Sequence, residues 1–332
     1  MWDMLQLVQA SSVRPRKLIG ETRREHSTTE PASSRSRLCK TVLFVFEMTI
    51  EILAGKQNPD GGWPYVRGVS WTEPTVYSIL AMLAAGENGR AARGSDWLRQ
   101  VARKDGGFAP QAGVVESTWV TALVALLPPE QLGAAAHEGA IRWLLGTTGN
   151  ESTTVYRLRE WLLGNARPAD QEFAGWPWTH GAAAWVGPTS LAILALERES
   201  RRRQSAEIAR RITEGRQFLA TRCCHEGGWN HGAVQALGYD SGPYPETTGM
   251  ALAALRGVDT PEVRRSIDLA QRFLAESHSA DAINWLGLGL MAHGCMPAGY
   301  SRPAGVECRT LLETSLAMLI GELQKGRDVL WG

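Results

Sequence analysis

From residue 41 onward, apolar residues recur three and four positions apart in segments separated by Gly, Pro or Asn. This spacing places them on one face of an α-helix, and no segment alternates in the manner of a half-buried strand. We therefore expect an all-α fold. The pattern predicts twelve helices, at residues 43–56, 73–86, 92–102, 116–127, 134–146, 152–163, 188–199, 204–222, 246–257, 261–277, 281–293 and 310–325.

The predicted helices are of two kinds. Residues 190–196 and 249–255 are apolar around most of the helix circumference, which is typical of helices buried between other helices. Residues 201–218 and 261–273 carry many charges on one face. The sequence therefore predicts an inner and an outer layer of helices. Between residues 143 and 188 the alternation breaks, and which predicted helix faces inward there stays open.

A repeated unit runs through this part of the chain. In three copies, an apolar residue followed by Leu lies eleven residues before the aromatic end of a Gly-Gly-aromatic triplet, and an acid-x-Thr segment then opens an apolar helix. The triplets end at Trp63, Phe108 and Trp229, and the helix-opening segments are 73–75, 116–118 and 246–248. A fourth, degenerate copy follows Trp176 and has Gly187 in place of the acid.

Each copy of this unit has the properties of a helical hairpin. The two glycines permit the positive φ that ends one helix and turns the chain. An acid in the first turn of the next helix complements the helix dipole. A hairpin of this kind cannot bury its apolar face alone, so stacked hairpins, and a ring of six, are expected.

The unit resembles a known family. Gln57, Gly61 and Trp63 resemble the Gln-Trp motif of squalene-hopene and oxidosqualene cyclases, and the whole unit is similar to the repeat of protein prenyltransferase β subunits. The resemblance, to prenyltransferase and squalene-cyclase-like repeat proteins, spans roughly residues 43–325. It implies an (α/α)6 toroid with a cavity at one end, lined by the loops after the triplets and by the starts of the inner helices.

The chemistry of these relatives is not carried over with the fold. Squalene-type cyclases have an Asp-x-Asp-Asp motif with the catalytic acid, and this motif is missing here. In the copies that resemble prenyltransferases, Thr75, Thr118 and Thr248 stand where those enzymes have a zinc-binding Cys. Thr is not a useful zinc ligand. Cys223, Cys224, His225 and His231 lack the spacing of a robust zinc site. We expect no metal, no cofactor and no identifiable partner subunit.

Composition narrows the partners further. The formal net charge of +1 gives no field that would attract nucleic acid. Residues 1–40 are basic and rich in Ser and Arg, which predicts a disordered arm before a single domain at 41–332; whether Met1 or Met48 is the true start stays open. Five cysteines and no secretory segment favour the cytoplasm. No apolar stretch is long enough to span a bilayer, and peripheral contact with a membrane stays open.

Three carboxylates are candidate catalytic residues. Glu73, Glu116 and Glu246 open helices in the repeat, so in a ring they would meet at one rim and serve as general acid and base. The alternative is that each one only stabilises its own helix start.

The 13 tryptophans outnumber Phe and Tyr combined and are the second candidate feature. Aromatic side chains near the triplets and the following loops are predicted to line the cavity: Trp63, Trp178, Trp185, Trp229, Tyr239 and Tyr244. Such a cavity would hold an isoprenoid by apolar burial. For the triplet residues Trp63 and Trp229 the alternative role is a wedge between hairpins.

These observations predict a toroid, related in fold to terpenoid cyclases and prenyltransferases, that binds an isoprenoid-like ligand. Whether it catalyses a reaction stays open; as an enzyme it would convert isoprenoids. Two alternatives remain. One is a carbohydrate-active α/α-barrel enzyme that uses rim carboxylates as acid and base. The other is a non-catalytic toroid that binds proteins.

Overall fold

The computed structural model describes residues 49–164, 173–232, 235–236 and 239–331, with the backbone alone at 235–236 and 239–240. The predicted arm at 1–40 and Met48 lie outside these residues. The regular structure of the described part is helical apart from three isolated β-bridges and one antiparallel pair of two-residue strands, β1 (Gln235–Ala236) and β2 (Tyr239–Asp240). The all-α prediction is confirmed. None of the described helices is both long and apolar enough to cross a bilayer.

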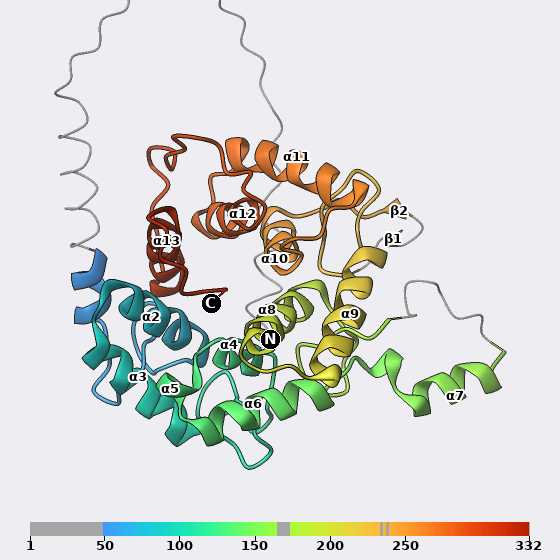
Figure 1. Cartoon of the computed structure of the whole chain (residues 1–332), viewed down its shortest axis with the longest axis horizontal. Helices are drawn as coiled ribbons and strands as arrows, with labels where there is room; N and C mark the ends of the chain where they lie inside the picture. Colours follow the sequence, from blue (N-terminus) through green and yellow to red (C-terminus); the bar gives the residue numbers. More distant parts are fainter. Residues whose placement is uncertain (1–48, 165–172, 233–234, 237–238, 332) are drawn as a thin grey trace, which may run out of the picture. The chain divides into compact units, whose positions relative to one another are not determined.

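Six helices form an inner ring, in which each packs on the next (Figure 1). They are α2 (Thr72–Ala85), α4 (Val120–Ala125), α8 (Val186–Arg202), α10 (Pro245–Ala254), α12 (Ala280–Ala292) and α13 (Leu311–Gln324). The prediction that the last hairpin meets the first is confirmed, because α13 packs on α2. The hydroxyls of Ser78 and Ser315 lie 3.1 Å apart at this closing contact, and the Leu311 N–H donates to the carbonyl of Tyr65 at 2.7 Å.

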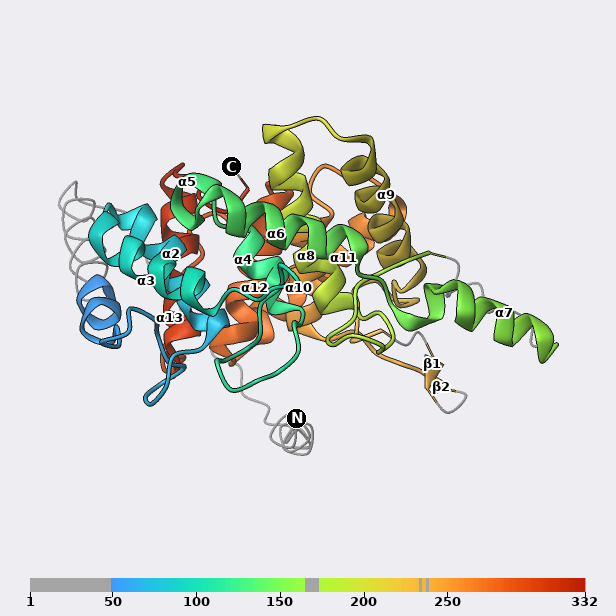
Figure 2. The same ribbon diagram turned by 90° about the horizontal axis from the view of Figure 1, so that it is seen from below.

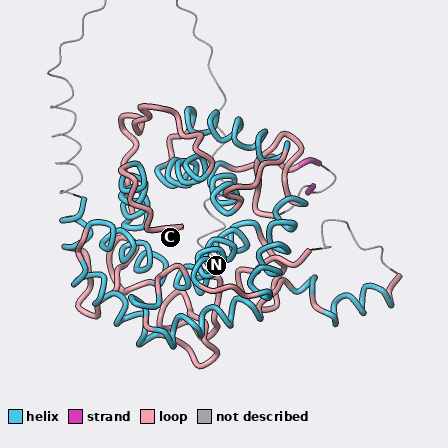
Figure 3. The backbone as a smooth tube through the Cα atoms, viewed as in Figure 1, coloured by secondary structure: helices cyan, strands magenta, loops and turns pink. Residues whose placement is uncertain are grey.

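Outer helices cover this ring, as Figure 3 shows in outline. They are α3 (Asn88–Val101), α6 (Ala134–Gly146), α9 (Ala206–Thr221) and α11 (Pro261–Glu276), preceded by a helix over residues 49–55. Burial separates the two layers. Ten of the 13 residues of α12 are buried, against five of the 16 residues of α11. The predicted two layers and the toroid fold are confirmed.

The pairing of helices differs from the prediction in one part of the ring. The segment between 143 and 188 connects outer α6 to inner α8, and the helix within it, α7 (Thr154–Leu162), belongs to neither layer. It has no buried residue and projects from the ring (Figures 1 and 2). In the sixth hairpin, residues 293–310 form turns and loops in place of the outer helix that a regular ring of six hairpins would contain. The remaining short pieces are α5 (Pro129–Leu132) and the 3-10 turn η2 (Asn150–Ser152).

The repeated aromatic residue joins each outer helix to the next inner one. The N–H groups of Trp63, Phe108, Trp176 and Trp229 donate to the hydroxyls of Thr75, Thr121, Thr189 and Thr248 at 2.8 to 3.0 Å. The indole N–H groups of the three tryptophans donate to leucine carbonyls at the end of the preceding outer helix, on Leu53, Leu144 and Leu219. The spacing between leucine and aromatic residue in the sequence reflects this bond.

Glycine permits the closest helix contact in the ring. A Cβ on Gly249 of α10 would lie 2.3 Å from the carbonyl carbon of Trp285 in α12, and one on Gly289 would lie 2.6 Å from the carbonyl oxygen of Gly249. Real Cβ atoms do not approach backbone atoms so closely. The apolar, Ala-rich character of α10 in the sequence therefore reflects backbone contact on one side as well as burial.

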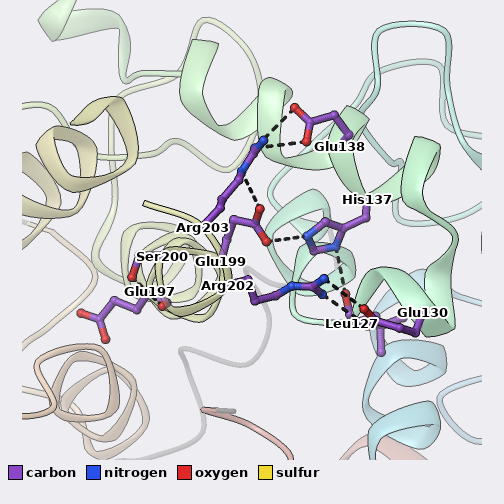
Figure 4. A network of polar contacts seen from close by, with 9 residues as sticks. All are labelled: Leu127, Glu130, His137, Glu138, Glu197, Glu199, Ser200, Arg202 and Arg203. Atoms are coloured by element: carbon purple, nitrogen blue, oxygen red, sulfur yellow. Dashed lines mark hydrogen bonds and ion pairs between the residues drawn. The ribbon is translucent and has the colours of Figure 1, made fainter. Parts of the chain in front are cut away.

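The two layers are also joined by a buried polar network at the end of α8 (Figure 4). Glu199 accepts a hydrogen bond from His137 Nε2 of α6 at 3.0 Å and forms an ion pair with Arg203, whose Nε lies 2.7 Å from Glu199 Oε1. The other ring nitrogen of His137 lies 3.0 Å from the carbonyl oxygen of Leu127. This network links α6 to α8, while the helices themselves pack as α6 on α4 and α8 on α9.

The C-terminal segment lies at the same end of the ring as the last turn of α8. Arg198 donates to the carbonyls of Val329 and Leu330, and Arg201 to that of Trp331. Trp331 is buried, with the Arg256 guanidinium 5.0 Å from its ring centre. The starts of the inner helices, where the sequence places the candidate acids, lie at the opposite end.

Candidate active site at the inner-helix starts

Two of the predicted acids and one unforeseen acid come together where the inner helices begin. Glu73 and Glu246 lie in the first turns of α2 and α10, and Asp281 lies in the first turn of α12. The charges of Glu246, Glu73 and Glu313 all act on Asp281. Glu313 is occupied in a capping box at the start of α13, where it accepts the N–H of Thr310 at 3.1 Å.

Asp281 has the properties of a proton donor. Burial, followed by the charges of Glu246, Glu73 and Glu313, raises its pKa to about 7, and a hydrogen bond with Trp285 offsets a smaller part. Its Oδ1 atom is buried and has no hydrogen-bond partner among the described residues. A carboxyl group with this pKa is partly protonated at neutral pH, as a general acid must be.

Glu73 is the second carboxyl group of this type. Burial raises its pKa to about 7, although the hydrogen bond from the Tyr65 hydroxyl to Glu73 Oε2 acts in the opposite direction. Desolvation and the Glu73 charge hold the pKa of Tyr65 far above its ordinary value, so the phenol stays the donor. Glu73 is therefore fixed by a tyrosine, while Asp281 keeps a free oxygen.

Tyr77 completes this group of side chains. Its ring lies edge-on to Trp285, with ring centres 6.2 Å apart. Its hydroxyl is buried and has no partner among the described residues. Burial and the charges of Glu73 and Asp281 raise its pKa well above the ordinary value, so it stays protonated. Two buried, unpartnered polar atoms, Tyr77 Oη and Asp281 Oδ1, thus belong to one group of mutually interacting side chains.

The third predicted acid, Glu116, does not join this group. The Thr121 hydroxyl accepts the N–H of Phe108, as Thr75 and Thr248 accept the N–H of the aromatic residue in their copies. Glu73 and Glu246 lie two residues before these threonines, and the residue two before Thr121 is Trp119. The alignment of residues 116–118 with 73–75 is therefore wrong by three residues. The side chain of Glu116 is exposed in the preceding loop.

The predicted aromatic residues separate into three groups. Trp63 and Trp229 are fully buried and fill the wedge positions between hairpins, their alternative role. Trp178 packs edge-on against Trp119, with ring centres 4.9 Å apart. The side chain of Tyr239 lies outside the described residues. Trp185 and Tyr244, at the starts of α8 and α10, are the two that line a cavity.

This cavity has a volume of about 480 Å³, and Glu73, Glu246 and Asp281 are not among its lining residues. Its walls come from the loops before α8 and α10, the segment after α9, η2 and the start of α7. His231, on the cavity wall, links the two regions, since the Glu246 charge acts on it as well as on Asp281. Burial lowers the pKa of His231, and Glu246 offsets part of that change.

The soft ligands at residues 223–225 and 231 do not gather into one metal site. Among the described residues, no group of three or more His, Cys, Asp and Glu side chains is placed to hold a metal ion. Cys223 instead lies 3.8 Å from the Ser266 hydroxyl, and burial raises the pKa of its thiol.

Comparison with known proteins yields neither a matching family model nor a matching curated protein. Solved structures do share the fold. A glycosidase variant has a TM-score of 0.54 and 12% identity, covering 89% of this chain and 99% of its own. The type II terpene cyclase MstE from Scytonema, in complex with geranylgeranyl dihydroxybenzoate, has a TM-score of 0.51 and 14% identity, covering 87% and 80%. A protein from Actinoplanes has a TM-score of 0.50 and 16% identity, covering 86% and 81%. At these identities the likeness concerns the α/α toroid fold.

Proposed function

We propose that this protein is an acid catalyst that acts on an isoprenoid-like substrate, with Asp281 as the proton donor. The observation that carries the proposal is the pair of buried, unpartnered atoms Asp281 Oδ1 and Tyr77 Oη at the inner-helix starts. An unpartnered buried polar group costs roughly 1–3 kcal/mol, and a substrate that accepts these hydrogen bonds would recover it.

The surroundings of Asp281 suit an apolar substrate that develops positive charge. The rings of Tyr77 and Trp285 lie beside the acid, and aromatic faces attract cations. The neighbouring carboxyl groups of Glu246, Glu73 and Glu313 act on the same position, and negative charge on them would stabilise a cation there. With a pKa of about 7, Asp281 is suited to protonating an oxygen of the substrate, such as an epoxide or a hydroxyl, because an unactivated alkene requires a stronger acid.

The test is conversion of polyprenyl substrates by the purified chain. Geranylgeranyl dihydroxybenzoate, an epoxidised polyprenyl compound and squalene would each be incubated with wild type, Asp281→Asn and Asp259→Asn, and the products identified by mass spectrometry. Asp259 is an exposed aspartate paired with Arg264 at 2.6 Å, so Asp259→Asn is the matched control. We expect conversion of the epoxidised compound, and not of squalene, by wild type and by the control, and no conversion by Asp281→Asn. Equal turnover by Asp281→Asn, or no conversion of any polyprenyl compound, would contradict the proposal.

Carbohydrate hydrolysis is the second candidate, and a specific observation favours it. Glu246 and Asp281 lie on neighbouring inner helices and interact, and glycosidases employ two carboxyl groups of which one is protonated and one charged. In that reaction Asp281 is the acid and Glu246 the base or nucleophile. Release of sugar from an oligosaccharide panel, abolished in both Asp281→Asn and Glu246→Gln, would select this function over the first.

A further inference from the structure

The cavity lined by Trp185 and Tyr244 has a continuous aromatic wall. The rings of Trp185 and His231 are 5.9 Å apart between centres, and those of His231 and Tyr244 are 5.1 Å apart, with a tilt of 34° between the last two. These three residues come from the loops before α8, after α9 and before α10. Trp185 and Tyr244 are also among the few large apolar side chains that are exposed. The fold thus presents ring faces to the cavity from two connections, Trp185 from the one between α7 and α8 and His231 and Tyr244 from the one between α9 and α10.

Buried polar side chains line the same cavity. Asn230, Glu151 and Arg222 have only 4%, 6% and 8% of their surface exposed. Each is held in place by the backbone. Both Glu151 oxygens accept the N–H of Ala184, at 3.0 and 3.2 Å, and Asn230 Oδ1 accepts the N–H of Gly232 at 2.9 Å. These groups are therefore positioned before any ligand arrives.

Arg222 supplies the cationic part of this lining. Its guanidinium lies 4.9 Å from the ring centre of Phe218 and donates to the Gly232 carbonyl. Glu151 supplies one negative charge in the same cavity, so the two formal charges cancel. Among the described residues that line it, the cavity consequently offers donors, acceptors and ring faces without an excess of either charge.

From this combination we infer that the cavity binds a neutral, hydroxyl-bearing ring, either a sugar or a phenol. A hydroxyl both donates and accepts, so it can use the guanidinium, the amide and the carboxylate together. A flat or saturated ring packs against the aromatic wall. The volume of about 480 Å³ lies within the range of small-molecule sites, roughly 300–1,000 Å³. This inference goes beyond the proposed function, because binding here requires no proton transfer from Asp281.

The experiment measures binding of four probes by calorimetry: methyl β-glucoside, resorcinol, glucuronic acid and glucosamine. We expect saturable binding of the glucoside or of resorcinol, and which of the two binds distinguishes the sources of the ring. Trp185→Ala and Asn230→Ala should each weaken that binding by about tenfold. Trp178→Ala is the matched control, since this tryptophan packs on Trp119 and does not line the cavity.

Three results would overturn the inference. The first is that neither neutral probe binds, and the second is that Trp185→Ala binds as well as wild type. The third is that glucuronic acid or glucosamine binds more tightly than both neutral probes. Circular dichroism of each variant separates lost binding from lost folding, and Tyr244→Phe, which keeps the ring, is a milder second variant of the wall. Asp281→Asn should bind the probes as wild type does while it loses turnover, so failure of this site and failure of the proposed reaction are distinguishable.

Discussion

Replacing Asp281 by Asn should stabilise the protein at alkaline pH. In the folded chain its pKa is raised to about 7, whereas an aspartate in an unfolded chain titrates near 4. The folded state therefore holds this proton more tightly than the unfolded state. Its contribution to stability is fully present below the unfolded value and is lost as the pH rises from about 4 to about 7. Asn carries no titratable proton, so the variant escapes that loss.

The magnitude is set by the difference in pKa. Three pKa units correspond to about 4 kcal/mol, at 1.36 kcal/mol per unit, as an upper bound. Partial exposure of the side chain and relaxation around it reduce this figure, and we expect a gain of about 1–2 kcal/mol for Asp281→Asn at pH 8.5. At pH 4.5, where Asp281 is protonated in the folded state, the gain should almost vanish.

Urea unfolding at pH 4.5, 6, 7 and 8.5 measures this effect in wild type, Asp281→Asn and Asp259→Asn. The contribution of the exposed Asp259 to stability has the opposite pH dependence. Its hydrogen bond with Arg264 lowers its pKa, so any stability it contributes is lost as the pH falls. The wild-type curve should decline more steeply than that of Asp281→Asn between pH 5 and pH 8. Glu73 has the same raised pKa of about 7, so its ionisation accounts for the decrease in the free energy of unfolding with rising pH that remains in Asp281→Asn. Parallel curves for wild type and Asp281→Asn would refute the burial of a titrating carboxyl group at this position.

Three further changes test the packing that positions the site. Gly249→Ala should lower the free energy of unfolding by more than about 2 kcal/mol or prevent folding, because its Cβ would overlap the Trp285 backbone. In the control, Gly321→Ala in α13, the new Cβ meets no atom within 4 Å, so this variant should be neutral or stabilising. Thermal melts of both variants measure the difference. Thr248→Val leaves the buried N–H of Trp229 without its acceptor and should cost about 1–3 kcal/mol in urea unfolding, while Thr248→Ser should recover most of it. Glu199→Gln should lower stability by about 2 kcal/mol and raise hydrogen exchange in α6, and unchanged exchange would contradict an anchoring role for the network.

The ring was predictable because its repeat is enforced by backbone contacts. The triplet glycines lie where a Cβ has no room: one on Gly61 would be 2.4 Å from the carbonyl oxygen of Arg93 in the next outer helix. The aromatic residue must reach both a helix end and a helix start, which fixes its spacing from Leu53 and from Thr75. Requirements of this kind remain visible in one sequence, so three copies sufficed to predict hairpins and a closed ring.

The exact register of one copy was not predictable. An acid-x-Thr segment at 116–118 matches the pattern, yet the equivalent threonine is Thr121, three residues later. The loop after Phe108 is longer than the loop after Trp63, and both Thr118 and Thr121 fit a helix start. Only the N–H of Phe108, which selects one hydroxyl, resolves the ambiguity. Glu116 was therefore placed with Glu73 although it lies in the loop.

Asp281 was missed for a different reason. Phe273 and Leu274 match the apolar-Leu pair that opens a copy, but no Gly-Gly-aromatic triplet follows them, so no pattern marks the start of α12 as equivalent to the others. Its importance arises from helices brought together by ring closure, since Glu73 is 208 positions earlier in the sequence. The projecting helix α7 was predicted as a helix from its apolar spacing, and its place in the two layers was left open. Its exposed residues, including Trp161, show that helical periodicity alone does not establish burial.

The direction of the inner helices separates the charges of this ring. Helix starts favour carboxylates and helix ends favour arginines, as observed for Glu246 at the start of α10 and Arg201 at the end of α8. The dipole contributes typically 0.3–1 kcal/mol, less than one pKa unit, and it lowers the pKa of an acid at a helix start. The pKa of Asp281 is nevertheless raised by about three units, so burial and the neighbouring acids outweigh the dipole severalfold. Helix direction therefore determines where the acids gather, and burial among them raises the pKa of both Asp281 and Glu73 to about 7.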